Sequence, residues 1–112
     1  MAKTLEQELS RHCRGFPLHN QIGRNDPVVC AKLYWPIGTV AWYIAGYDSK
    51  SYVAFGFMTG MGDDRWGYFS VMAVAETLIA GVAPTLDKDF TPEFASRIGL
   101  PIQELAASGE GT

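Results

Sequence analysis

Residues 28–69 constrain the fold more than any other part of the chain, because they contain three aromatic-rich apolar runs separated by short turn clusters. The runs cover 28–35, 39–47 and 51–59. Pro, Gly, Asp and Ser in the intervening clusters favour tight turns. The pattern predicts a small antiparallel meander over 28–69, with a short fourth strand over 66–69. Gly56, inside the third run, predicts a β-bulge or a close backbone approach.

Helical signals precede the meander. Leu5, Leu9 and Cys13 recur at the spacing of one helix face. Thr4 fits the N-cap of this helix, with a capping box completed three residues later by a glutamine. A glycine and a proline shortly after Cys13 mark its end, so we expect a helix within residues 1–15.

Further helices are predicted after the meander. Ser70 fits the N-cap of a helix over 71–80, which Gly81 would end. Thr91 fits the N-cap of a second short helix, with Pro92 at its first helical position. We therefore expect residues 70–107 to be mainly helical.

The whole chain is predicted to form one α+β domain over residues 1–112. Its 112 residues are 47% hydrophobic and 19% charged, which suits an ordered domain with a real core. The expected architecture is an antiparallel sheet of three to four strands, the N-terminal helix of 1–15, and helices from 70–107 packed on the sheet.

The N-terminal sequence and the cysteine content predict a cytoplasmic protein. No apolar run approaches the roughly 18 residues of a membrane span. The first 15 residues are polar and lack the apolar region of a signal peptide. Two cysteines are too few for a disulfide scaffold, and the cytosol would keep them reduced.

The net charge of −3 is unevenly distributed. Residues 1–32 carry five basic and three acidic side chains, whereas residues 33–112 carry four basic and nine acidic ones. An acidic body repels phosphates, which argues against direct contact with nucleic acid. It suits a partner with a basic surface, although a charge of this size can also serve only to keep a small domain in solution.

The order of five segments resembles a family of small bacterial proteins, classed as a domain of unknown function, that occurs on plasmids, phages and integrative elements. The segments are KLYWP (32–36), AWYIAGYD (41–48), FGFMTG (55–60), RWGYFS (65–70) and LDKDFTP (86–92). With their connections they span residues 28–98. The resemblance implies an α+β fold and a mobile-element context, and it implies no activity. Small acidic proteins of such elements include inhibitors of host defence, such as anti-CRISPR and anti-restriction proteins, and this one is expected to be of that kind.

Two groups of residues could form a metal-binding or catalytic site. His12, Cys13, His19 and Cys30 offer ligands for zinc, or a cysteine nucleophile, but they match no recognised spacing. Acidic pairs in the loops could hold a cation, yet they lack the calcium-loop pattern. A Cys/His metal protein or small enzyme is therefore an alternative interpretation, while the leading one has no bound metal, no cofactor and no catalytic residue.

The many aromatic residues could form either the core or a partner-binding surface, because a sheet has two faces and both faces carry large rings here. The candidate partner-binding residues are Trp35, Trp42, Tyr43, Asp63, Asp64 and Trp66. Trp and Tyr are common interface anchors, and the acids could stand in for phosphates on a basic nucleic-acid-binding site.

The sequence thus predicts a small, non-enzymatic binding protein of a mobile genetic element that acts by protein–protein contact, as a monomer or homodimer and away from membranes. Its expected partner is a host defence or nucleic-acid-processing complex. A nucleic-acid-binding accessory protein that uses Arg11, Arg14, Arg24 and Lys32 is a further alternative.

Overall fold

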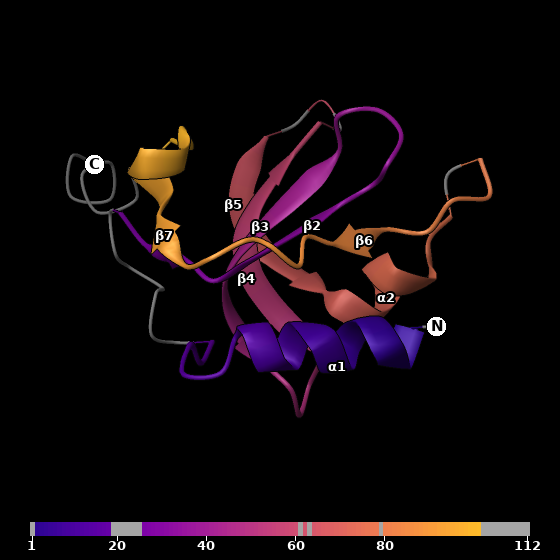
Figure 1. Ribbon diagram of the computed structural model, residues 1–112, viewed down its shortest axis with the longest axis horizontal. Helices are drawn as coiled ribbons and strands as arrows, with labels where there is room; N and C mark the ends of the chain where they lie inside the picture. Colours follow the sequence, from indigo (N-terminus) through magenta and orange to yellow (C-terminus); the bar gives the residue numbers. More distant parts are fainter. Residues whose placement is uncertain (1, 19–25, 61, 63, 79, 102–112) are drawn as a thin grey trace, which may run out of the picture.

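The computed structural model describes residues 2–18, 26–60, 62, 64–78 and 80–101, and within them it contains a five-stranded antiparallel sheet, a two-stranded sheet and two α-helices (Figure 1). The larger sheet has the order β5 (Arg65–Ser70), β4 (Val53–Thr59), β3 (Ala41–Asp48), β2 (Ala31–Tyr34) and β6 (Thr85–Leu86). The smaller sheet pairs β1 (Val28–Val29) with β7 (Glu93–Phe94). The helices are α1 (Ala2–His12) and α2 (Val71–Glu76), and a 3₁₀ turn, η1, covers Ala95–Ile98.

The α+β class and the antiparallel meander are confirmed, but the expected strand number of three to four is too low. The fifth strand, β6, pairs Leu86 with Leu33 and Thr85 with Tyr34. Two residues are too few to produce an alternating pattern, so the sequence gives no strand signal there. The run 28–35 also forms two strands rather than one, because β1 pairs with β7 while β2 pairs with β3.

The core lies between one face of the larger sheet and the two helices, which lie side by side near one end of that sheet (Figure 1). We call this the inner face. Leu9 of α1, Leu33 of β2, Ile44 of β3 and Val71 of α2 are completely buried in it. The apolar face predicted for α1 therefore packs on the sheet, as expected for an amphipathic helix. Neither helix in the described part of the chain has the length and apolarity needed to cross a membrane.

The predicted helix ends are only partly correct. Ser70 caps α2 as predicted, since its hydroxyl oxygen accepts a hydrogen bond from the Ala73 N–H at 3.2 Å. However, α2 ends at Glu76 instead of Ala80. Thr77 adopts an extended backbone, and its hydroxyl donates to the Ala73 carbonyl at 2.7 Å, a local bond that competes with helix continuation. At the N-terminus, α1 already begins at Ala2, so the predicted cap position lies inside the helix.

The helix expected from Thr91 is replaced by β7 and η1. Glu93 and Phe94 pair with the two residues of β1. Asp26 accepts hydrogen bonds from the Ser96 N–H at 2.9 Å and from the Ser96 hydroxyl at 2.6 Å. These contacts with a distant part of the chain outweigh the local capping signal, because helix propensity is weak beside tertiary contacts.

Candidate functional site

Two of the predicted partner residues, Trp35 and Trp42, belong to the core. Their side chains are 4% and 3% exposed, and their rings meet edge to face with centroids 4.8 Å apart. The Trp35 indole N–H donates to the Val82 carbonyl at 3.0 Å, which satisfies its polar group inside the protein. A partner therefore has no access to either ring in this structure.

The opposite side of the larger sheet, which we call the outer face, carries six aromatic side chains and one lysine. They are Lys32, Tyr34, Tyr43, Phe55, Phe57, Trp66 and Tyr68. Strand pairing places Lys32 beside Tyr43, and Phe57 between Tyr43 and Trp66. None of these side chains is part of the core cluster between the sheet and the helices.

Rings of the outer face pack on each other. Phe55 and Phe57 are each 5% exposed, and Trp66 contacts both, with ring centroids 5.8 Å and 5.4 Å away. Tyr68 packs on Phe55 with a centroid distance of 5.3 Å, yet it remains 56% exposed. The Trp66 indole N–H donates to the Pro101 carbonyl at 2.9 Å, so the chain near Pro101 reaches this face. The outer face is thus a partly covered aromatic layer with Tyr68 open to solvent.

Lys32 adds a positive charge to this layer. Its Nζ lies 5.7 Å from the centre of the Tyr34 ring and 5.3 Å from that of Tyr43. Both distances fall in the range of cation–π interactions, which hold an ammonium over an aromatic ring. All three side chains are half-buried, so they form a second accessible part of the outer face beside Tyr68.

The predicted acids do not form a joint site among the described residues. Asp64 is exposed and closes the β4–β5 loop, since it accepts hydrogen bonds from the Thr59 hydroxyl at 2.9 Å and the Gly60 N–H at 3.1 Å. Asp63 lies outside the described residues. The structure therefore brings Tyr43 and Trp66 together on the outer face, places Asp64 at the end of β4, and separates Trp35 and Trp42 from them.

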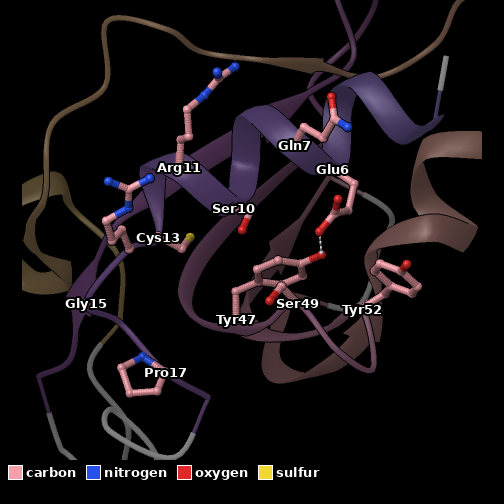
Figure 2. A pocket seen from close by; sticks show the side chains of 11 residues that line it. Glu6, Gln7, Ser10, Arg11, Cys13, Gly15, Pro17, Tyr47, Ser49 and Tyr52 are labelled. Atoms are coloured by element: carbon pink, nitrogen blue, oxygen red, sulfur yellow. Dashed lines mark hydrogen bonds between the residues drawn. The ribbon is translucent and has the colours of Figure 1, made fainter.

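A surface cavity of about 680 Å³ lies on the other side of the molecule, between α1 and the β3–β4 hairpin (Figure 2). Its lining includes Glu6, Ser10 and Cys13 from α1 and the turn after it, and Tyr47 and Tyr52 from the hairpin. The Tyr47 hydroxyl donates to the Glu6 carboxylate at 2.6 Å, a bond drawn in Figure 2. The sequence did not indicate this cavity, because its two halves are 41 residues apart at that bond and share no motif.

The Tyr47–Glu6 bond predicts a dependence of stability on pH. Burial, and secondly the Glu6 carboxylate, raise the pKa of the Tyr47 phenol well above its ordinary value of about 10. Above pH ~10 the unfolded chain loses this proton while the folded protein keeps it. The contribution of Tyr47 to the free energy of unfolding is therefore complete below that pH and declines as the pH rises further.

We expect Tyr47→Phe to lower the free energy of unfolding by about 1–2 kcal/mol at neutral pH, because the Glu6 carboxylate loses its donor. The difference from the wild type should shrink between about pH 8 and about pH 11, since only the wild type has this phenol to titrate. Urea unfolding at both pH values measures the difference in the free energy of unfolding between the variant and the wild type. Tyr52→Phe is the control, because this exposed tyrosine lines the same cavity, and it should change stability by less than about 0.5 kcal/mol. A difference that stays constant with pH would contradict the assigned titration.

Of the four Cys/His residues, the structure brings Cys13 and Cys30 together, with their Sγ atoms 2.7 Å apart and both side chains buried. His12 lines a different cavity, beside Glu8 and Lys88. His19 lies outside the described residues. Among the residues that the structure does describe, no three His, Cys, Asp or Glu side chains are grouped as a metal site would require.

No family model matches the chain, and no curated protein or solved structure matches it either. The family resemblance drawn from the five segments therefore stays a prediction.

Proposed function

We propose that this protein is a small binding domain that docks a protein partner through its outer face. One observation carries the proposal: the sheet packs its helices on the inner face, while aromatic rings of the outer face stay accessible, with Tyr68 56% exposed. Tyr and Trp rings contribute large contact areas with little loss of conformational freedom, and they are enriched at interfaces. Tyr68, Tyr43 and Trp66 are the proposed anchors.

The charge of the protein supports a finer proposal about the partner. The net charge is −3, and Asp64 lies exposed at the end of β4, next to the start of β5. An acidic protein with this carboxylate near the strand ends favours a partner that carries basic groups around an apolar patch. Together with the resemblance to proteins of mobile elements, this supports an inhibitor that covers the nucleic-acid-binding site of a host defence complex.

A second candidate is single-stranded nucleic acid, which one observation favours. Lys32 over Tyr34 and Tyr43 combines a cation with two rings, and bases stack on such aromatic platforms. The acidic balance of the chain opposes this candidate, since nucleic-acid sites usually carry several cations along the backbone path. We therefore rank it below a protein partner.

Affinity capture with an outer-face variant tests the proposal. Tagged wild type, Tyr43→Ala/Tyr68→Ala and Leu78→Ala are incubated with lysate of the native host, and the retained proteins are quantified by mass spectrometry. Leu78 is 61% exposed and follows α2, the helix that packs on the inner face, so its variant controls for the loss of an exposed apolar side chain. Circular dichroism confirms that all three proteins are folded.

We expect a partner that the wild type and Leu78→Ala retain equally and that the double variant retains at least about tenfold less, as for interface hot spots. The purified partner should then bind with the same ranking. Equal retention by all three proteins would contradict docking at the outer face. A single-stranded DNA oligonucleotide that binds the wild type in a steeply salt-dependent way, and fails to bind Lys32→Ala, would favour the second candidate instead.

A further inference from the structure

Cys13 and Cys30 form a buried thiol pair that neither the aromatic surface nor the Tyr47–Glu6 bond uses. Cys13 lies in the turn that ends α1, and its N–H still donates to the Leu9 carbonyl at 2.9 Å. Cys30 lies between β1 and β2, where its N–H donates to the Ile44 carbonyl at 2.7 Å. Backbone hydrogen bonds thus hold both residues in place within the core cluster, with their Sγ atoms 2.7 Å apart.

This separation is closer to a covalent bond than to a non-bonded contact. A disulfide bond is about 2.05 Å long, whereas non-bonded heavy atoms usually approach to about 3.5–4 Å. Both cysteines are free thiols in this structure. We propose that Cys13 and Cys30 are a redox-modification site that a small-molecule disulfide converts into an intramolecular disulfide bond, with Cys13 reacting first and Cys30 resolving the intermediate.

Access sets the order of the two steps. Cys13 is 5% exposed and belongs to the lining of the 680 Å³ surface cavity in Figure 2, so this cavity is the route that we infer for a small reagent to its sulfur. Cys30 is 0% exposed and lies behind Cys13 in the core cluster. An outside disulfide therefore meets Cys13, and only Cys13 can present a mixed disulfide to Cys30.

The exchange is balanced with a reagent RSSR. The Cys13 sulfur attacks one sulfur of RSSR, forms a Cys13–S–S–R bond and releases RS⁻, which takes the proton that Cys13 loses. The Cys30 sulfur then attacks the Cys13 sulfur, forms the Cys13–Cys30 bond and releases the second RS⁻, which takes the Cys30 proton. The protein loses two protons and two electrons, the equivalent of two hydrogen atoms, and RSSR is reduced to two RSH.

The surroundings of the two thiols determine how fast the disulfide bond forms and how much it stabilises the fold. The contact with Cys30, and secondly burial, raise the pKa of the Cys13 thiol, so little thiolate exists at neutral pH and the exchange is faster in alkaline solution. The bond would tie the end of α1 to the β1–β2 junction and close a loop between residues 17 positions apart. A cross-link over a loop of this size should raise Tm by about 10 °C.

Oxidation of the reduced wild-type protein tests the proposal directly. The full chain is incubated with 2-hydroxyethyl disulfide at about pH 9 and analysed by intact mass, thiol titration and thermal unfolding. We expect a monomer that is lighter by two hydrogen atoms, has no titratable thiol and unfolds about 10 °C higher. Dithiothreitol should reverse all three changes. Persistent free thiols, stable adducts on both cysteines or disulfide-linked dimers would each overturn the proposal.

Single variants test the order of the steps. Cys30→Ser should stop at a stable adduct of one 2-mercaptoethanol unit on Cys13, since no second thiol resolves it. Cys13→Ser should react at least about tenfold more slowly, because the remaining thiol has no access to solvent. Circular dichroism before the reaction confirms folding, and alanine versions replace any serine variant that fails to fold. Equal rates for the two variants would overturn the assigned order, while the wild-type result tests the disulfide independently.

Discussion

Replacing Gly56 with alanine is expected to lower the free energy of unfolding by about 3 kcal/mol or more, at or beyond the upper end of overpacking effects in well-packed proteins. Gly56 lies in the middle of β4, paired with Ile44 on one side and Gly67 on the other. A Cβ atom there would lie 2.2 Å from the Tyr43 carbonyl oxygen and 2.9 Å from the Ile44 Cα. Both are backbone atoms of β3, so no side-chain rotation relieves the clash.

The adjacent glycine provides a matched control. Gly67 faces Gly56 across the β4–β5 pair, and a Cβ atom there would meet only the terminal methyl group of Met58, at 3.9 Å. We expect Gly67→Ala to change stability by less than about 0.5 kcal/mol, while Gly56→Ala lowers Tm by at least about 10 °C. Thermal and urea unfolding of the two variants measure the difference. Similar stability of both variants would mean that β3 and β4 lie farther apart than the structure places them.

Gly56 also shows how much of the fold the sequence predicts. A glycine inside an apolar run indicated a bulge or a close backbone approach, and the close approach to β3 is confirmed. The irregularity in the ladder lies on the opposite strand, between Ile44 and Gly46. The meander is predictable because each of its strands has its own alternating pattern and neighbouring turn residues.

The missed elements share a physical cause. β6 and β7 are two residues long, and their pairing with β2 and β1 depends on residues far away in the chain. No local pattern encodes such pairing. The same holds for the end of α1, where Cys13 meets Cys30, and for the cavity where Tyr47 meets Glu6. Local signals were most reliable where a single side chain decides the geometry, as at Ser70.

Sequence alternation separated the two sheet faces but did not say which one the helices cover. Trp42 and Tyr43 are neighbours in β3 and point to opposite faces. Both were predicted as partner residues. Trp42 is 3% exposed and belongs to the core cluster of the inner face, whereas Tyr43 lies on the outer face. The candidate surface therefore keeps Tyr43 and Trp66, and Tyr68 joins it. Predicting Tyr68 would have required knowing that the helices leave this face free and that its ring is exposed.

Trp42→Ala tests this assignment of faces, and we expect it to lower the free energy of unfolding by about 3–5 kcal/mol, as for other large-to-small changes in a core. The Trp42 ring contacts Trp35 at 4.8 Å and Phe69 at 6.4 Å between centroids, and it lies across from Leu33 of β2. Its removal leaves a cavity in the core on the inner face that these neighbours cannot fill. Urea unfolding provides the measurement, with Tyr68→Ala as the exposed aromatic control.

The paired result separates a core role from a binding role. Tyr68→Ala should cost less than about 1 kcal/mol in stability, since the ring is 56% exposed, but it should weaken partner capture. Trp42→Phe should keep partner capture while losing about 1–2 kcal/mol of stability, because a smaller ring still fills part of the space. If Trp42→Ala instead remained stable and lost its partner, the helices would have to cover the other face. The outer face would then be the core, and the proposed docking surface would be on the wrong side of the sheet.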